Sequence, residues 1–179
     1  VYRTGMVMKP VFERAKSDIK RVVYAEGEED TILRAVQTVV DEKLARPILI
    51  GRPAVIEKRI ARLGLRIRAG EHFELTNIDD DPRYNEYWGL YHKLTERRGI
   101  TPPLAKALVR SRPSLIAALM VSRGEADAMI CGIVGRYQRQ LRHILDVLPL
   151  DPGVSAPAAM TAVQNDRGTW FFVDTHVQY

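Results

Sequence analysis

Two glycines and a run of arginines give this sequence its strongest pattern for ligand binding. The segment 132–137, Gly-Ile-Val-Gly-Arg-Tyr, follows a predicted strand, and its glycines let the backbone approach a ligand closely. Arg136 lies at the start of the next predicted helix, beside amide groups that have no partner inside that helix. Arg139 and Arg142 are three residues apart and lie near each other on one helical face. Because guanidinium groups bind phosphate and carboxylate groups, the pattern predicts an anion site; the alternative is a solvated surface helix.

Two other groups of polar residues follow predicted strands. Glu26, Glu28 and Glu29 follow the first strand, and their charges would repel a phosphate. This segment is therefore interpreted as a charged turn before a helix that Asp30 caps. The segment 174–176, Asp-Thr-His, follows the last strand and is a candidate for acid–base catalysis or, alternatively, for a turn or an interdomain contact. The sequence has no Walker lysine motif, no three-glycine dinucleotide fingerprint and no nucleophile elbow, so no catalytic residue is assigned.

Composition narrows the partners of the chain. The 179 residues include one cysteine, Cys131, so no intramolecular disulfide can form, and with four scattered histidines no structural zinc site is expected. A lone cysteine favours a reducing, cytoplasmic setting, with Cys131 as a small buried apolar residue. The net charge of +5 comes from basic residues mixed with acidic ones, and no apolar run is long enough for a membrane span. We therefore expect neither nucleic acid nor membrane as a partner, and the positive net charge leaves nucleic-acid binding as an alternative.

Apolar patterning predicts the scaffold that must hold these residues. Residues 21–25, 47–50 and 128–131 are apolar runs typical of buried strands, and amphipathic helices separate them. This alternation predicts an α/β fold with a mostly parallel sheet and helices on both faces, a three-layer α/β/α arrangement. Further strands are expected at residues 73–75, 158–163 and 169–173, the last two as a pair. Helices are expected at residues 9–18, with Pro10 in the first turn, and at 30–40, 53–63, 79–98, 101–112, 114–123 and 137–148.

Five segments of the chain, in order, resemble the phosphate acetyl/butyryltransferase family. They lie at residues 21–28, 44–53, 97–101, 123–132 and 172–175, and the agreement runs from about residue 7 to the end. Within the family, the chain is most similar to the C-terminal phosphotransacetylase-like domain of large bacterial NADP-dependent malic enzymes. That likeness rests on residues 2–12, Tyr-Arg-Thr-Gly-Met-Val-Met-Lys-Pro-Val-Phe, and on residues 81–88, Asp-Pro-Arg-Tyr-Asn-Glu-Tyr-Trp.

The resemblance implies a two-lobed domain, of which this chain holds the first lobe. Residues 1–18 would be the linker and helix that follow an absent malic enzyme catalytic domain, residues 19–150 the first α/β lobe, and residues 151–179 the truncated start of the second lobe. Because it begins with Val1 in place of an initiator methionine, the chain is expected to be part of a longer one. The resemblance also implies a regulatory, acetyl-CoA-sensing and assembly domain of a homo-oligomer. NADP and a divalent metal (Mg or Mn) would bind only in the absent malic domain.

The resemblance further bears on the site itself. Arg142 matches an arginine of the family, so the ligand-binding residues are expected to be Gly132, Gly135, Arg136 and Arg142, with an acyl-CoA as ligand and no metal. Stand-alone transferases usually carry a histidine or similar residue and two hydroxyl residues where this chain has Gly135, Arg136 and Tyr137. We therefore expect that this segment does not catalyse acetyl transfer between coenzyme A and phosphate, which is the alternative function.

Overall fold

The computed structural model describes residues 2–173, which fall into two compact units. One unit runs from Ile19 to Leu148, and the other combines residues before Ile19 with residues after Leu148. The second unit contains α1 (Tyr2–Ser17) and an antiparallel hairpin of β5 (Met160–Asn165) and β6 (Gly168–Val173). The hairpin confirms the prediction of paired strands in this region.

The predicted start of the first helix is wrong. The helix begins at Tyr2, and Pro10 lies inside it and not in its first turn. Proline is common in a first turn because it lacks an N–H group and clashes with the preceding turn, so it is a good marker of a helix start but not a strict one. Met6, Met8 and Lys9 are good helix formers and continue the helix upstream of the proline.

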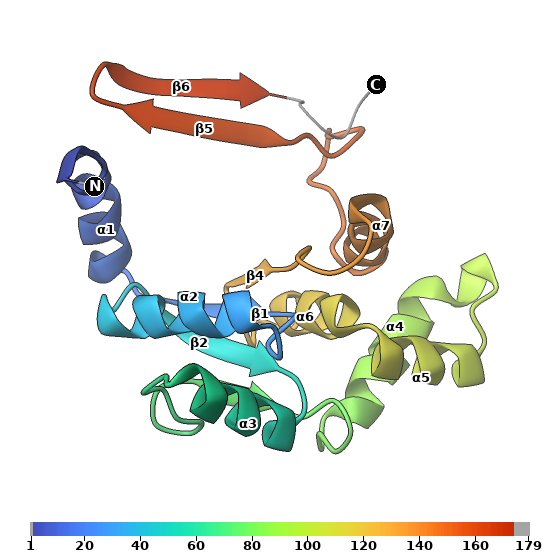
Figure 1. Cartoon of the computed structure of the whole chain (residues 1–179). Helices are drawn as coiled ribbons and strands as arrows, with labels where there is room; N and C mark the ends of the chain where they lie inside the picture. Colours follow the sequence, from blue (N-terminus) through green and yellow to red (C-terminus); the bar gives the residue numbers. More distant parts are fainter. Residues whose placement is uncertain (1, 174–179) are drawn as a thin grey trace. The chain divides into compact units, whose positions relative to one another are not determined.

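The larger unit is built on a parallel four-stranded sheet (Figure 1). Its strands are β1 (Lys20–Tyr24), β2 (Ala45–Ile50), β3 (Glu74–Thr76) and β4 (Ala128–Ile130), in the order β3-β2-β1-β4. Val22 is the partner of Pro47 in β2 and of Ala128 in β4, and all three strand pairings are parallel. The prediction of a mostly parallel sheet is confirmed.

Helices cover both faces of this sheet, because successive strand residues point to opposite sides. Val23 and Ile48 belong to one core cluster with α4 to α7, whereas Tyr24 and Leu49 belong to a second cluster with α2 and α3. The three-layer arrangement is therefore as predicted. The helices of this unit are α2 (Asp30–Asp41), α3 (Pro53–Leu63), α4 (Tyr84–Thr95), α5 (Pro102–Ser111), α6 (Pro113–Ser122) and α7 (Tyr137–Val147), with a short 3-10 helix at Glu96–Arg98.

Two predicted helix starts differ from the structure for a shared reason. Asp30 does not cap α2: Glu29 is the N-cap residue, and the Asp30 carboxylate instead accepts hydrogen bonds from Arg62 of α3. Residues 79–83 are not helical; the Asp81 carboxylate accepts a hydrogen bond from the backbone N–H of Arg83, 2.8 Å away, which favours a turn. In both cases an aspartate finds a partner other than the free amides of a helix.

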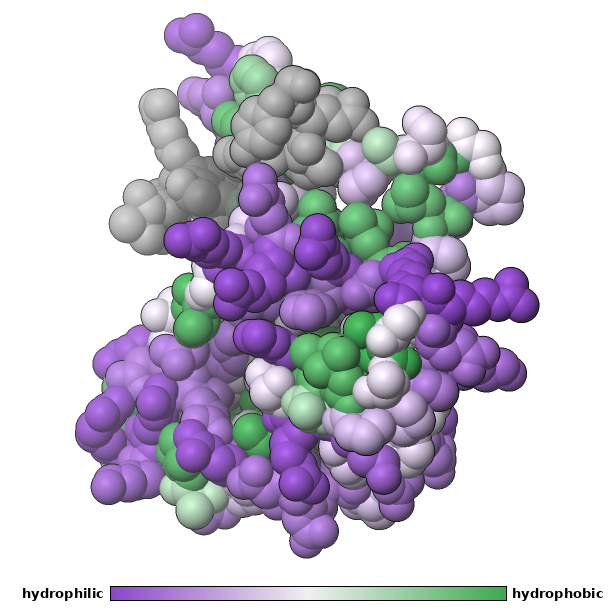
Figure 2. Space-filling model, turned by 90° about the vertical axis from the view of Figure 1, so that its right-hand side faces the viewer, coloured by the Kyte–Doolittle hydropathy of each residue, from purple (hydrophilic) through white to green (hydrophobic). Residues whose placement is uncertain are grey.

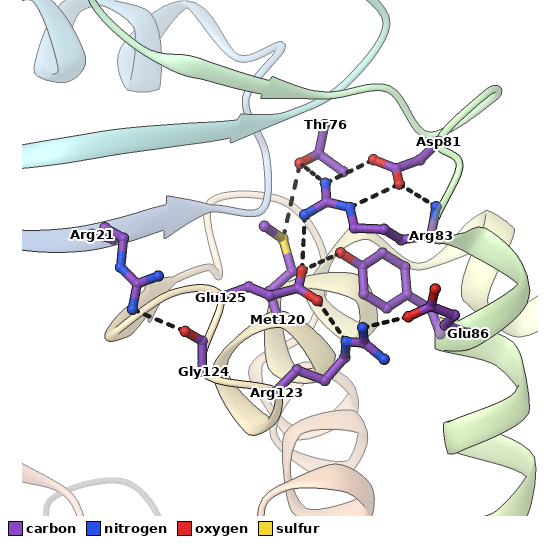
Figure 3. Close-up of polar contacts among 10 residues, drawn as sticks. Arg21, Thr76, Asp81, Arg83, Glu86, Met120, Arg123, Gly124 and Glu125 are labelled. Carbon is purple, nitrogen blue, oxygen red and sulfur yellow. Dashed lines mark hydrogen bonds and ion pairs between the residues drawn. The ribbon is translucent and has the colours of Figure 1, made fainter.

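A network of charged side chains fixes α4 against the connection between α6 and β4 (Figure 3). The guanidinium of Arg83 pairs with Asp81 and Glu125, each at 2.8 Å, and donates to the Thr76 hydroxyl at 3.2 Å. Glu125 also accepts hydrogen bonds from Tyr87 and from Arg123. Although burial raises the pKa of Glu125, these hydrogen bonds and the two arginine charges outweigh it and hold the pKa below its usual value. The network thus links β3, α4 and the segment before β4.

The face of the molecule that Figure 2 draws is largely polar. Figure 2 shows hydrophilic residues across most of the face that it draws, with hydrophobic residues in small groups. Across residues 2–173, no helix is both long enough and apolar enough to cross a membrane.

Candidate functional site

A cavity of about 340 Å³ lies in the larger unit, where the strands of the parallel sheet end. The loops after β1, β2 and β4 contribute Gly27, Gly51 and Gly135 to its lining, and Ile78 follows β3. Ligands of open parallel sheets bind at this end, because the loops that leave the strands meet there. The cavity therefore occupies the position that the fold class favours for a small-molecule site.

Four helices begin at this cavity. Their N-cap residues, Glu29 of α2, Arg52 of α3, Arg112 of α6 and Arg136 of α7, all line it. The first turn of each helix has backbone N–H groups without partners inside the helix, and the helix dipole adds partial positive charge there. Four such ends around one cavity favour an anionic ligand.

Three arginines add full positive charge to the cavity. Arg112, Arg136 and Arg139 line it, and within residues 2–173 none of the three has a carboxylate partner. By contrast, Arg52, the fourth arginine of the lining, is paired with Glu28. Unpaired guanidinium groups at a cavity are free to bind a phosphate or carboxylate, and Arg112 is only partly exposed, which strengthens such an interaction.

The acidic turn after β1 lines the same cavity, which the sequence analysis did not anticipate. Glu28 accepts two hydrogen bonds of 2.8 Å from the Arg52 guanidinium, and these bonds hold its pKa below the usual value. Glu26 accepts a 2.9 Å hydrogen bond from the backbone N–H of Gly132. The cavity is lined by three carboxylates and four guanidinium groups, so its net charge is positive even with the acidic turn present. The expected repulsion of a phosphate is thus offset.

Buried polar atoms without partners gather at this cavity. Among the described residues they are one carboxylate oxygen of Glu26, the Nε of Arg112 and both ring nitrogens of His143. All three residues line the cavity. A buried polar atom without a hydrogen bond costs free energy, about 1–3 kcal/mol, so a concentration of them at one place is typical of a functional site.

The predicted site residues take different positions around this cavity. Gly135 and Arg136 line it, whereas Gly132 does not, and its N–H group is already bonded to Glu26. Arg142 is exposed on α7 and lies outside the lining, while Arg139, its neighbour on the helix, lies inside. The role of these residues in ligand binding stays a prediction.

The loop before α7 is held at both ends. Glu26 binds Gly132 at its start, and the Gln140 side chain donates a 2.9 Å hydrogen bond to the carbonyl of Val134. Gly132 and Gly135 have φ angles of 111° and 94°, a conformation that favours glycine. The glycines thus shape the loop that brings Arg136 to the cavity.

Other candidates from the sequence lie elsewhere. Cys131 is half-buried against the core, and burial raises the pKa of its thiol, so it is a poor nucleophile. The segment 174–176 lies outside the described residues. Within residues 2–173 no cluster of three or more histidine, cysteine, aspartate or glutamate side chains is placed to hold a metal ion.

Sequence reasoning missed Arg112 and His143. Residues 111–114, Ser-Arg-Pro-Ser, carry a helix-start signal in Pro113, which could have directed attention to Arg112 as an N-cap residue. For His143 the signal was its spacing: it lies four residues after Arg139 and therefore on the same helical face. Neither signal shows by itself that the starts of α6 and α7 meet.

The fold and the cavity define a class of protein: a parallel α/β domain with a small-molecule cavity suited to an anion at the ends of its strands. The chain belongs to the phosphate acetyl/butaryl transferase family, whose sequence model matches residues 6–179. The resemblance noted from the sequence is therefore confirmed at the level of the family.

The proteins that are similar to this chain are much longer than it is. It is 48% identical over 177 residues to the "NADP-dependent malic enzyme" of Escherichia coli (strain K12) and 46% identical over 177 residues to that of Haemophilus influenzae (strain Rd). Each alignment covers 99% of this chain and 23% of the relative, so the chain spans about a quarter of the length of these proteins. The structure of the EutD phosphotransacetylase from Staphylococcus aureus superposes with a TM-score of 0.83 at 18% identity, over 98% of this chain and 52% of that one. At that identity, the superposition supports the shared fold alone.

Proposed function

We propose that this chain is the regulatory, acetyl-CoA-sensing domain of an NADP-dependent malic enzyme and takes part in its assembly as a homo-oligomer. The parent reaction would be the oxidative decarboxylation of malate to pyruvate, with NADP and Mg or Mn bound by a domain outside this chain. The names and the 46–48% identity of the malic enzyme relatives support this proposal. In the same proposal the protein acts in the cytoplasm, without a nucleic acid or a membrane as partner.

The observation that carries the proposal is the convergence of four helix starts and three unpaired arginines on one cavity. Coenzyme A is rich in phosphate groups, and phosphate groups bind at helix N-termini and at arginine forks. A volume of about 340 Å³ is at the lower end of the range for small-molecule sites. The cavity would therefore hold a phosphate-bearing part of acetyl-CoA, with the remainder outside it.

The proposal is tested by replacing the cavity arginines in the full-length protein. We expect Arg139→Ala and Arg112→Ala each to weaken acetyl-CoA binding by about 1.5 to 3 kcal/mol, the range for hydrogen bonds to a charged group. Malate turnover without acetyl-CoA should stay near the wild-type rate. Isothermal titration calorimetry gives the affinity, and the NADP-linked absorbance assay gives the turnover.

Arg34→Ala is the matched control, because Arg34 is an exposed helical arginine that does not line the cavity. Arg142→Ala separates two arguments: the resemblance predicts a loss of affinity at Arg142, and the cavity lining predicts a larger loss at Arg139. If the Arg112 and Arg139 variants respond to acetyl-CoA at wild-type concentrations, the cavity is not the sensing site.

A working phosphate acetyltransferase is the second candidate, and family membership is the observation that favours it. Transfer requires groups that hold the thioester and the attacking phosphate together and stabilise the oxyanion. At the positions in question this chain has Gly135, Arg136 and Tyr137, none of which supplies an aliphatic hydroxyl group. Formation of acetyl phosphate from acetyl-CoA by the purified protein, above a control without protein, would favour this second candidate.

A further inference from the structure

His143 is a partly buried histidine in the wall of the candidate cavity. It lies on α7 one turn after Arg139, and it lines the cavity with Arg139 and with Arg136, the N-cap residue of that helix. Neither of its ring nitrogens is accessible to solvent, and neither has a hydrogen-bond partner among the described residues. A neutral imidazole has one donor and one acceptor nitrogen, so both functions of this ring are unused.

The charges that face His143 are predominantly positive. They are Arg112 from the junction of α5 and α6, Arg139 and Arg142 from its own helix, and one acid, Asp146. Asp146 is itself paired with Arg98, from the 3-10 helix after α4, at 2.5 Å. Burial and, next, the Arg112 charge lower the pKa of His143 below its ordinary value. The ring is therefore neutral at pH 7 in the free protein.

The remaining charged residues that line the cavity lie on its other walls. They are Glu26, Glu28 and Glu29 after β1, Arg52 after β2, and Arg136 at the start of α7. Glu28 and Arg52 pair with each other, so their charges largely cancel. Of the other charged residues of the lining, Arg112, Arg136 and Arg139 outnumber Glu26 and Glu29, so the net charge of the lining is positive.

We infer that His143 is a ligand-binding residue of this cavity and takes up a proton when an anionic ligand enters it. The inference rests on the proposed acetyl-CoA site and adds a pH dependence to it: the cavity binds its anion more tightly as the pH falls. A phosphate group next to Arg112 and Arg139 offsets the positive potential that, in addition to burial, disfavours protonation of the ring. A protonated ring then offers donors on both nitrogens, and the anion accepts from one of them.

The direction in which ligand affinity changes with pH follows from proton linkage. If the pKa of His143 is higher in the complex than in the free protein, the complex binds more protons over the interval between the two values. Affinity then rises as the pH falls through that interval, by at most tenfold per pH unit for one proton, and levels off below the lower value. Because burial and the Arg112 charge hold the pKa of His143 in the free protein below its ordinary value, the levelling is expected only in mildly acidic solution.

The test compares the full-length wild type with His143→Gln, which can still donate a hydrogen bond but does not titrate. Acetyl-CoA affinity is measured from pH 6 to pH 8, and calorimetry in buffers of different ionisation enthalpy gives the number of protons taken up. Because acetyl-CoA carries a phosphate that titrates near pH 6, the difference between the two proteins is the informative quantity. We expect wild-type affinity to fall at least threefold more than that of His143→Gln across this range.

His92→Gln is the matched control, because His92 lies on α4 outside the cavity and near Glu96; it should behave as wild type. A second measurement needs no variant: NMR titration of His143 in the wild-type protein should show its pKa rise when acetyl-CoA is added. Equal pH dependence in wild type and His143→Gln, or no change in that titration, would refute the inference and leave the proposed function standing. Absence of acetyl-CoA binding to the wild type at every pH would instead refute the proposed function.

Discussion

Gly27 lies where two loops at the ends of the strands touch. Its N–H donates a 3.1 Å hydrogen bond to the carbonyl of Ile50 at the end of β2. A side-chain Cβ at this position would lie 2.8 Å from that carbonyl oxygen and 3.0 Å from the Ile50 nitrogen. Both atoms belong to the backbone, so no side chain can move aside to make room.

We expect Gly27→Ala to lower the free energy of unfolding by about 1 to 3 kcal/mol, the range for overpacking a filled site. Gly89→Ala is the control, because Gly89 lies inside α4 and a Cβ added there would have no other part of the structure within 4 Å. Alanine there should raise stability by up to about 1 kcal/mol through its helix propensity. Denaturant unfolding of both variants checks this, and equal stability of the two would show that the loops separate at little cost.

At the level of single residues, the sequence indicated only part of the candidate site. It pointed to Gly135 and Arg136, because glycines and a helix start follow an apolar strand. It set the acidic turn at Glu26 aside on charge alone, since the compensating pair of Glu28 with Arg52 joins two different loops. Ion pairs between loops depend on strand order, which single-residue patterns do not contain.

Among the elements, α4 is attached to the sheet by one arginine as well as by the core packing of Tyr87 and Tyr91. Arg83 binds Asp81 beside it, Thr76 at the end of β3 and Glu125 before β4. Its side chain is a third exposed, and the Asp81 and Glu125 side chains are 10% and 21% exposed. Without the guanidinium, the poorly hydrated Asp81 carboxylate would lose its counter-charge, and Glu125 would keep only Arg123.

We expect Arg83→Met to destabilise the protein by about 1 to 3 kcal/mol, a range that allows for its partial exposure. Arg68→Met is the comparison: Arg68 and Glu71 are 78% and 59% exposed, and their pair should contribute well under 1 kcal/mol. Thermal unfolding followed by circular dichroism measures both. A loss at position 83 no larger than at position 68 would mean that solvent replaces the network.

Element boundaries were predictable where proline or glycine fits its usual position. Pro53 and Pro113 begin α3 and α6, and Gly64 ends α3 in the left-handed conformation with φ 64°. Pro10 was misleading because a helix can contain a proline when neighbouring residues favour it. Asp30 was misleading because it pairs with Arg62 across two helices, a tertiary contact that overrides the local capping preference.

For the whole molecule, both described core clusters lie within the unit from Ile19 to Leu148. One cluster fills each face of the parallel sheet, and neither uses a residue of α1 or of the hairpin. By contrast, the hairpin strands β5 and β6 are exposed along their whole length. Stability of the sheet is therefore expected to be independent of the second unit.

We expect a fragment of residues 19–148 to fold alone and to unfold in one cooperative transition, because it retains all the buried apolar surface of the sheet. Near-ultraviolet circular dichroism and calorimetry check this. A shorter fragment of residues 19–132, which lacks α7 and the buried Val147, should lose part of the core and unfold with less cooperativity. Loss of near-ultraviolet signal in the longer fragment would show that the second unit is needed.

The strand order has a consequence for how the cavity comes into being. β1 and β2 are neighbours in the chain as well as in the sheet, but β4 reaches β1 only through contacts such as Arg21 with Asp127, 106 residues apart. Closing so long a loop is entropically costly, so β4 is expected to join a sheet that its partners have already begun. The loop from Gly132 to Arg136 arrives with β4, and one wall of the cavity is therefore completed last. A ligand bound there would therefore stabilise the pairing of β4, the last strand to join the sheet.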